Sequence, residues 1–316
     1  MDLRAIRARL TRWYGRYKRD LPWRRTRDPY AIWISEVMLQ QTRVAAVVPY
    51  YLRFLARFPD AKSLADAPEA DLLMIWSGLG YYSRARNLQR AAREIEERGQ
   101  FPNEYEQLLG LAGVGPYTAA AIASMAFELP HAVVDGNVRR VLSRLANDGN
   151  TDAQKLADQL LDRRHPARWN QAVMELGAMI CLPRNPQCES CPLALNCGAR
   201  HAGTQHELPP KRTKRAAERL ERTLLIIRSE ESLILVPSPR VKGFWDLPEP
   251  FPGARLGAVI GEFRHSITHT RYRFIVREVT VKRKMPKAAQ RTKLSQLDHT
   301  PLSTIARKAL GIYEAK

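Results

Sequence analysis

The chain has 316 residues, of which 45% are hydrophobic and 26% are charged, a composition typical of globular proteins with room for two domains. It contains no run of about 18 apolar residues, which excludes a transmembrane helix. Aromatic and branched side chains are spread along the whole chain, which excludes a wholly disordered protein. The formal net charge is +19 at pH 7. Such an excess indicates a polyanionic partner, for which nucleic acid and an anionic membrane surface are the alternatives.

Charge and hydrophobic patterning both change near residue 200. Residues 1–200 carry 28 basic and 21 acidic side chains in long stretches of helical period, whereas residues 201–316 carry 23 basic and 11 acidic side chains around short β-rich runs. The segment between them is polar and basic and contains Pro209 and Pro210. We therefore expect a helical domain over 1–200, a basic linker over 201–220 and a smaller domain over 221–316.

The first 19 residues form an arginine-rich segment with apolar side chains at helical spacing, namely Leu3, Ile6, Leu10, Trp13 and Tyr17. A mitochondrial transit peptide has a similar character. This segment is poor in serine, however, and continues directly into Asp20–Trp23, so we expect a folded amphipathic helix. Because no secretory signal is apparent either, the chain is predicted to be cytoplasmic.

Several further stretches predict helices. The first, Tyr30–Phe58, is expected to form one or two helices interrupted near Pro49. Within it Glu36 has apolar neighbours, which indicates either a paired structural carboxylate or an acid with a raised pKa. The other predicted helices cover residues 66–78, 83–99, 104–109, 118–127 and 170–181.

Two of these helices are joined by the tight turn Gly113-Val114-Gly115, which predicts a helix–hairpin–helix. The glycines let the backbone approach a phosphate closely, and the second helix offers its first N–H groups to an anion. In a chain with a net charge of +19, this turn indicates binding to the DNA backbone without regard to sequence.

Asp135 ends an apolar run and directly precedes a further amphipathic helix. At that position it is expected to cap the helix by accepting hydrogen bonds from amides of the first turn. A capped aspartate stays ionised, so the same side chain is also suited to face a cation.

The four cysteines lie within seventeen residues, at Cys181, Cys188, Cys191 and Cys197. In an intracellular chain, so tight a cluster indicates metal ligation rather than disulfides. A zinc site and a [4Fe–4S] cluster both fit the C-x6-C-x2-C-x5-C spacing. For either metal we expect a structural role, because thiolate-bound metal contributes folding energy to a small loop.

In the last third of the chain, strands are predicted at Thr223–Arg228, Ser232–Val236 and Arg271–Lys284, followed by a helix near Leu302–Leu310. The eleven acidic residues of 201–316 are scattered, with no group of glutamates suited to hold magnesium. This domain is therefore expected to bind a ligand rather than to hydrolyse one.

Three segments together resemble the helix–hairpin–helix DNA glycosylases that carry an iron–sulfur cluster: Leu109–Ala119, Val133–Val141 and the four cysteines. The run Ser35–Val44 is similar to the adenine DNA glycosylase (MutY) family, whose members remove adenine mispaired with 8-oxoguanine or guanine. The resemblance is close over 1–200 and loose over 221–316. It implies a multidomain fold: a mainly α helix–hairpin–helix glycosylase domain with a [4Fe–4S] loop at 181–197, and a smaller α+β Nudix-like domain that recognises the lesion.

The resemblance also implies roles for individual residues. Glu36 would protonate the departing adenine, and Asp135 would stabilise the sugar cation or bond to it. Tyr117 and Asn137 would brace these two carboxyl groups. The adenine pocket would be lined by Trp23, Arg24, Leu39 and Gln171, and the residues that wedge into the duplex would be Gln41, Thr42, Leu79 and Tyr81.

The chemistry of base removal needs both carboxyl groups. Cleavage of an N-glycosidic bond passes through an oxocarbenium-like state, as glycoside hydrolysis does. One protonated acid must serve the leaving base, and one ionised carboxylate must serve the sugar. Because the target base lies inside the stack, it must first be flipped out at a cost of about a few kcal/mol.

Position 117 separates two kinds of relative. Bifunctional glycosylases of this fold carry a lysine there as the nucleophile for a Schiff base. This chain has Tyr117 and no lysine between Lys62 and Lys155, so we expect a monofunctional enzyme that leaves the abasic site uncut. Some thymine-mismatch glycosylases of the same fold also carry tyrosine at this position.

In the C-terminal domain, the resemblance implies a recognition loop at Phe263–Thr270. The family's usual triplet there is Phe-Ser-His, whereas this chain has Ile267-Thr268-His269. Thr268 keeps a hydroxyl and His269 keeps the imidazole, but Ile267 lacks the aromatic ring. An ordinary strand-turn-strand is the alternative interpretation of this stretch.

These observations favour a monomeric enzyme acting on double-stranded DNA that contains a mismatched adenine. Two alternatives remain at this level. One is a thymine or uracil mismatch glycosylase, and the other is a non-catalytic iron–sulfur protein that binds DNA.

Overall fold

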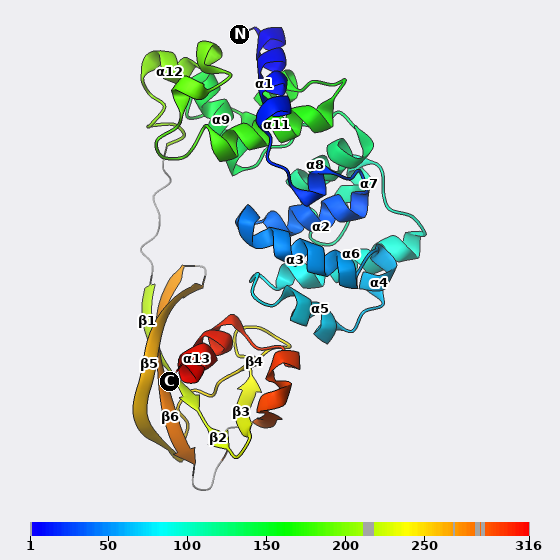
Figure 1. The fold of residues 1–316 in the computed structure, drawn as a ribbon. Helices are drawn as coiled ribbons and strands as arrows, with labels where there is room; N and C mark the ends of the chain where they lie inside the picture. Colours follow the sequence, from blue (N-terminus) through cyan, green and yellow to red (C-terminus); the bar gives the residue numbers. More distant parts are fainter. Residues whose placement is uncertain (1, 211–217, 268, 282–284, 286–287, 316) are drawn as a thin grey trace. The chain divides into compact units, whose positions relative to one another are not determined.

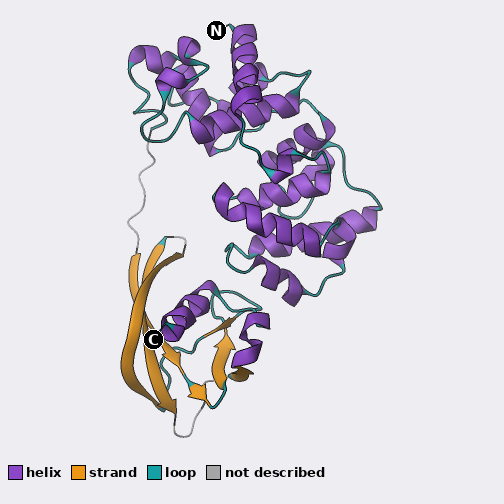
Figure 2. Ribbon diagram, in the orientation of Figure 1, coloured by secondary structure: helices purple, strands orange, loops and turns teal. Residues whose placement is uncertain are grey.

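The computed structural model describes residues 2–210, 218–267, 269–281, 285 and 288–315, and the chain divides into two compact units. Unit 1 comprises Met1–Asp66 and Asn87–Arg212, and unit 2 comprises Ala67–Arg86 and Thr213–Lys316. Over the described ranges, unit 1 is helical and every strand belongs to unit 2 (Figure 2). None of the helices in these ranges is long and apolar enough to cross a membrane.

Unit 1 is a bundle of helices joined by short turns (Figure 1). Helix α6 (Ser83–Arg98) begins in unit 2 and continues into unit 1. The other helical elements of unit 1 are α1 (Leu3–Tyr17), η1 (Pro22–Arg24), α2 (Pro29–Leu39), α3 (Val44–Arg57), α4 (Ala61–Ala65), α7 (Tyr105–Leu109), α8 (Pro116–Phe127), α9 (Gly136–Ala146), α10 (Ala153–Leu160), α11 (Pro166–Met179), η2 (Cys188–Ser190), η3 (Ala194–Asn196) and α12 (Gly198–Ala202).

Helix α1 confirms the amphipathic helix expected at the N-terminus. Its carboxylate cap is Asp2, which accepts hydrogen bonds from the amides of Arg4 and Ala5 at 3.0 and 3.1 Å. Its apolar face is buried in a core shared with α9, α10 and α11. The α1 residues in this core are Ile6, Leu10, Trp13 and Tyr14.

The interruption predicted near Pro49 is wrong. The chain leaves the helical path at 40–43, where Gln41 adopts φ of 58°, and Pro49 lies inside α3. Pro49 occupies the second turn of α3, where its missing N–H removes one intrahelical hydrogen bond. The buried side chains Val47, Tyr51 and Phe54 follow helical spacing through this position, so their packing holds the helix together.

Helices α7 and α8 form the predicted helix–hairpin–helix. Gly113 has φ of +75°, and a Cβ added there would lie 2.6 Å from the Cβ of Asn87. Gly115 is the N-cap of α8, where nothing lies within 4 Å of an added Cβ. Glycine is therefore needed at 113 for conformation and packing, whereas at 115 an added Cβ would meet no other atom.

Unit 2 combines helix α5 (Glu69–Trp76) and the start of α6 with two small sheets and a C-terminal helix. Its strands are β1 (Glu218–Ile226), β2 (Arg228–Ser229), β3 (Ser232–Pro237), β4 (Trp245–Asp246), β5 (Ala254–Ile267), β6 (Thr270–Val281) and β7 (Gln290–Lys293). They are followed by η4 (Leu294–His299) and α13 (Thr304–Glu314).

The first sheet has the order β1-β6-β5, with β1 parallel and β5 antiparallel to β6. In the second sheet β3 pairs with β2, β4 and β7, in each case antiparallel. Strand residues from both sheets and the apolar face of α13 bury one core. Its members include Leu224, Leu235, Phe274, Ile305 and Leu310. The smaller α+β domain expected from the sequence is therefore present.

The segment Phe263–Thr270 is a hairpin rather than an extended loop. Phe263 to Ile267 complete β5, and Ile267 pairs with Thr270 at the start of β6. Side chains of β5 alternate between the core and solvent through this stretch, so the strand pattern continues to the turn. His269 is exposed in the turn, and Thr268 lies outside the described residues.

The loop between α5 and α6 packs against other parts of unit 2. The ring of Tyr82 lies 4.1 Å from that of Phe244, centroid to centroid, and its hydroxyl is 3.4 Å from Oγ1 of Thr304. Leu79 is buried, whereas Tyr81 is 48% exposed with φ of 50°. The guanidinium of Arg84 donates to the carbonyls of Leu79 and Gly80, which holds the loop in this shape.

Candidate active site

A cavity of about 570 Å³ opens inside unit 1. Its walls come from η1, the end of α2 and the turn after it, the starts of α8 and α9, and one face of α11. Ten of the residues singled out in the sequence line this cavity: Trp23, Arg24, Glu36, Leu39, Gln41, Thr42, Tyr117, Asp135, Asn137 and Gln171. Segments that are far apart in the chain thus bring the expected acid, carboxylate and pocket residues together.

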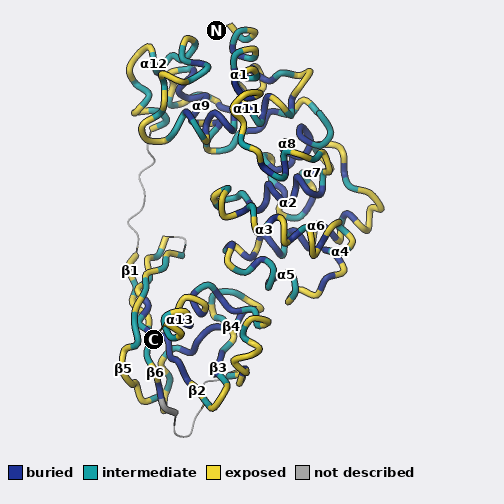
Figure 3. The backbone as a smooth tube through the Cα atoms, in the orientation of Figure 1, coloured by how far each residue is buried: buried dark blue, intermediate teal, exposed yellow. Residues whose placement is uncertain are grey.

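Glu36 lies in α2, a helix that is buried along most of its length (Figure 3). Its side chain accepts a hydrogen bond of 2.6 Å from the hydroxyl of Tyr117. Burial raises the pKa of Glu36 to about 7, helped by the negative charge of Asp135 and opposed by the Tyr117 hydrogen bond and by Arg24. Of the two interpretations left open by the sequence, an acid with a raised pKa fits this geometry.

Tyr117 lies in the first turn of α8, the helix that follows the hairpin. Burial and the neighbouring Glu36 carboxyl raise the pKa of its phenol well above the usual range, so it remains a neutral donor. The hydroxyl also approaches the sulfur of Met174 at 3.6 Å. Tyr117 therefore holds one oxygen of Glu36 and leaves the other oxygen available to a ligand in the cavity.

Asp135 is the N-cap of α9, as predicted. Its Oδ1 accepts from the amide of Val138 at 2.6 Å, and its Oδ2 accepts from the Asn137 side chain at 3.2 Å. The Asp135 carboxyl thus meets the positive end of the α9 dipole and two hydrogen-bond donors. Asp135 and Glu36 thus share one cavity but sit in opposite environments, one polar and one apolar.

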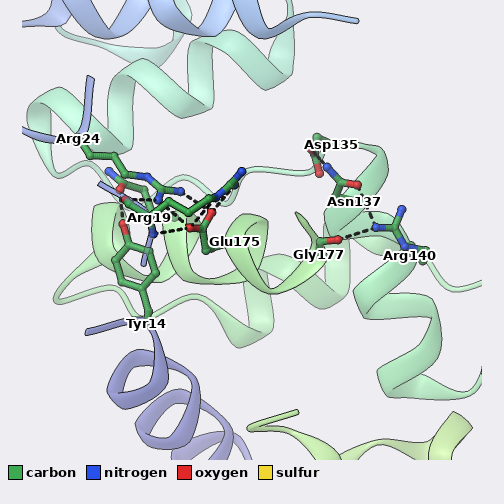
Figure 4. A network of polar contacts seen from close by, with 9 residues as sticks. Tyr14, Arg19, Arg24, Asp135, Asn137, Arg140, Glu175 and Gly177 are labelled. Atoms are coloured by element: carbon green, nitrogen blue, oxygen red, sulfur yellow. Dashed lines mark hydrogen bonds and ion pairs between the residues drawn. The ribbon is translucent and has the colours of Figure 1, made fainter. Parts of the chain in front are cut away.

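A buried arginine connects this cap to the region of the cysteines. Arg140 donates to Oδ1 of Asn137 at 2.9 Å and to the carbonyl of Gly177 at 2.8 Å (Figure 4). Its Nε donates to the carbonyl of Cys181 at 2.8 Å. The orientation of Asn137, and through it that of Asp135, therefore depends on where α11 ends and the cysteine loop begins.

A second buried carboxylate of the cavity, Glu175, was not predicted from the sequence. Arg24 and Arg19 both bind the carboxylate of Glu175, which is fully buried on α11 (Figure 4). Tyr14 donates to Oε1 of Gln171 at 2.5 Å, one turn earlier on the same helix. One sequence signal existed: Glu175 stands in an apolar helix four residues after Gln171, a setting comparable to that of Glu36.

The four cysteines are free thiols that line one small cavity. Arg144 reaches the sulfur of Cys181 at 3.4 Å, and the Oε1 atom of Gln205 is buried without a partner against the same cavity. Over the part of the chain that the structure describes, no three Cys, His, Asp or Glu side chains are arranged to hold a single metal ion. Four thiols that line one cavity are suited to hold a metal centre through their sulfurs.

The other predicted site residues that the structure describes are not among those that line this cavity. Gly113, Val114 and Gly115 form the hairpin of unit 1. Leu79 and Tyr81 belong to the loop of unit 2, and His269 to its exposed hairpin turn.

Comparison with known proteins gives three findings. Residues 34–166 match the model of the HhH-GPD superfamily base excision DNA repair protein. An adenine DNA glycosylase from Mus musculus is 46% identical over 217 residues, which cover 63% of this chain and 42% of that protein. An adenine DNA glycosylase from Buchnera aphidicola subsp. Baizongia pistaciae is 36% identical over 249 residues, covering 76% of this chain and 71% of that protein. The chain thus spans about two fifths of the length of the mammalian relatives.

A solved structure of a thermostable thymine-DNA glycosylase is similar in fold, with a TM-score of 0.60 and 30% sequence identity. The match covers 63% of this chain and 97% of the other.

The raised pKa of Glu36 predicts that the free energy of unfolding decreases as pH rises. Because its folded pKa of about 7 exceeds the ordinary value of 4.5, the native state holds this proton more tightly, so stability falls as pH rises from about 4.5 through 7. Between pH 5 and pH 8, the free energy of unfolding should fall by about 2–3 kcal/mol more in the parent than in Glu36→Gln. Urea unfolding of both proteins, with the exposed Glu97→Gln as control, measures the difference. An equal pH dependence in parent and Glu36→Gln would show that Glu36 ionises normally.

Proposed function

The chain belongs to the adenine DNA glycosylase family, and on this premise we propose that it removes adenine mispaired with 8-oxoguanine or guanine from duplex DNA. The product is an abasic site. The observation that carries the proposal is the pairing of Glu36, buried and hydrogen-bonded by a neutral phenol, with the capped Asp135 in one cavity.

The two carboxyl groups divide the work of N-glycosidic cleavage. Glu36 keeps its proton near neutral pH because it is buried, so it can protonate a ring nitrogen of the departing adenine. Asp135, held by the Val138 amide at the start of α9, supplies the carboxylate that stabilises the positive charge developing on the sugar. Tyr117 and Asn137 hold these groups in place through the hydrogen bonds already described.

The rest of the cavity suits a flipped-out base. Trp23 and Leu39 supply apolar walls, and Arg24 and Gln171 supply polar groups at its edge. Gln41 and Thr42, in the turn that follows α2, are proposed to enter the duplex near the vacated position, together with Leu79 and Tyr81 of unit 2.

DNA contacts outside the cavity complete the proposal. The hairpin at 113–115 offers the open amides of α8 to a phosphate, and the net charge of +19 supports binding to the backbone. We assign glycosylase chemistry to a domain over 1–200 and lesion recognition to a Nudix-like domain over 221–316, through Thr268 and His269. No lysine stands where Tyr117 does, so the abasic site is left uncut.

The cysteine loop is proposed to hold a [4Fe–4S] cluster, with Cys181, Cys188, Cys191 and Cys197 as its ligands. When bound, the cluster supplies cross-linking energy to a loop that has little apolar core of its own. Arg144 ties this loop to α9, because it donates to the carbonyl of Leu182 at 2.7 Å as well as to the Cys181 sulfur.

A single-turnover assay tests the glycosylase. The substrate is a duplex with one central A:8-oxoguanine pair, quenched with and without alkali. We expect strand cutting at the adenine only after alkali, and a loss of at least about a hundredfold in Glu36→Gln, because the acid step is removed. Glu97→Gln, an exposed change on α6, should cut at the parental rate.

Other outcomes would exclude specific parts of the proposal. Cutting without alkali would contradict the monofunctional role inferred from Tyr117. Release of thymine from a G:T duplex instead of adenine would favour a thymine mismatch glycosylase, the activity named for the similar solved structure. Tight DNA binding without release of either base would indicate a non-catalytic DNA-binding protein.

Metal analysis tests the cluster. The purified protein should contain about four irons and four acid-labile sulfides per chain and absorb near 410 nm, and Cys191→Ser should lose both. One zinc per chain and no sulfide would contradict the cluster assignment.

A further inference from the structure

Glu175 is a fully buried carboxylate that receives five hydrogen bonds from two arginines. Arg24 donates to Oε1 at 2.9 Å and to Oε2 at 2.8 Å. Arg19 donates its backbone amide and its Nε to Oε1 at 2.8 and 3.0 Å, and Nη2 to Oε2 at 2.6 Å. Burial alone would raise the pKa of Glu175, but the hydrogen bonds from Arg24 and Arg19 outweigh it and lower the pKa to about 2. Glu175 is therefore an anion at neutral pH.

The two arginines differ in their surroundings. The Arg19 side chain is 35% exposed and part of its charge is met by water, whereas the Arg24 side chain is 11% exposed. Arg24 also donates to the carbonyl of Arg19 at 3.0 Å and lies over the ring of Tyr14, with its Cζ 5.6 Å from the ring centroid. Glu175 is thus the counter-ion of a cation that is almost completely enclosed by the cavity wall.

Arg24 shares that cavity with Glu36. Three ionisable groups on different elements act on the Glu36 carboxyl: Tyr117 from α8, Asp135 at the start of α9 and Arg24 from η1. Arg24 is in turn paired with Glu175 from α11. A buried guanidinium stabilises a nearby carboxylate and so promotes loss of its proton. Left uncompensated, Arg24 would oppose the apolar environment that keeps Glu36 in its acid form.

We propose that Glu175 is a positioning residue that holds Arg24 at the wall of the adenine pocket and offsets much of its charge, so that Arg24 draws the proton from Glu36 less strongly. The inference rests on the proposed glycosylase function and extends it to a residue beyond the reacting carboxyl groups. Both oxygens of Glu175 are bonded by Arg24 and Arg19, so Glu175 acts through Arg24.

The test is the pH profile of single-turnover adenine release from the A:8-oxoguanine duplex. In the parent, the rate should fall as pH rises through the pKa of Glu36, because the acid is lost. In Glu175→Gln, Arg24 keeps its charge without a counter-ion, so this fall should begin about one pH unit lower. Relative to the parent, the variant should lose about tenfold at pH 8 and no more than about twofold at pH 5.

Three further variants separate charge from structure. Glu175→Asp keeps the anion, so its profile should return to the parental position. Asp20→Asn breaks an exposed ion pair with Arg25 on the same segment and should leave the profile unchanged. Arg24→Gln removes the cation and should move the fall to higher pH, whatever its effect on the absolute rate. This last variant also keeps the test decisive if Glu175→Gln does not fold.

The outcomes distinguish a failure of the proposed function from a failure of the positioning role of Glu175. A parent that releases no adenine overturns the proposed function, and the positioning role with it. A parent that is active, with Glu175→Gln slowed by the same factor at every pH, overturns the positioning role alone and leaves Glu175 a structural residue. An unmoved profile in Arg24→Gln likewise overturns it.

Discussion

The protonated carboxyl of Glu36 is the interaction on which the rest of the site depends. Burial in an apolar helix makes Glu36 harder to ionise than an exposed glutamate, and this effect outweighs the Tyr117 hydrogen bond, which favours the carboxylate. Glu36 therefore retains its proton at a pH where an exposed glutamate has lost it. The groups around it are compatible with this state: Tyr117 is a neutral donor, Asp135 is bonded by the Val138 amide, and the cation Arg24 is paired with the carboxylate of Glu175.

Helix α11 supplies most of this support. It carries Gln171 and Met174 toward the cavity and Glu175 toward the two arginines. Gly177 lets the start of α9 approach, because a Cβ there would lie 2.8 Å from the Cβ of Asn137. Two residues after the helix ends, the carbonyl of Cys181 accepts from Arg140, so the cysteine loop and the carboxylate cap share one framework. A change in the cysteine loop can thus alter the orientation of Asn137 and Asp135 in the cavity, although the loop does not line that cavity.

Some of this arrangement could be predicted from the sequence, because the residues concerned are marked by their immediate neighbours in the chain. Glu36 stands out because a carboxylate in an apolar helix breaks a simple pattern, and Asp135 because it sits where a helix must begin. The four cysteines stand out by spacing. In each case the signal lies within a few residues, and the structure brings Glu36 and Asp135 into the same cavity.

Other features depend on contacts that no short segment contains. Glu175 has the same local setting as Glu36, yet its partners lie more than 150 residues earlier, so nothing nearby marks it as an ion-pair centre. Pro49 suggests a break that tertiary packing overrides, while the real break follows from the left-handed Gln41. Strand β5 could not be predicted from the sequence either, because its first half is mostly exposed and has bulges where it pairs with β6.

The most direct test of the central claim is the titration of Glu36 itself. Protein labelled with 13C at the glutamate carboxyl carbons would be followed by NMR from about pH 3.5 to about pH 9, a range that spans the ordinary and the raised pKa of a glutamate, with Glu36→Gln to assign the resonance. Burial predicts a titration midpoint about 7. A midpoint near the ordinary value of 4.5 would mean that Glu36 is ionised at neutral pH, and the acid role assigned to it here would be wrong.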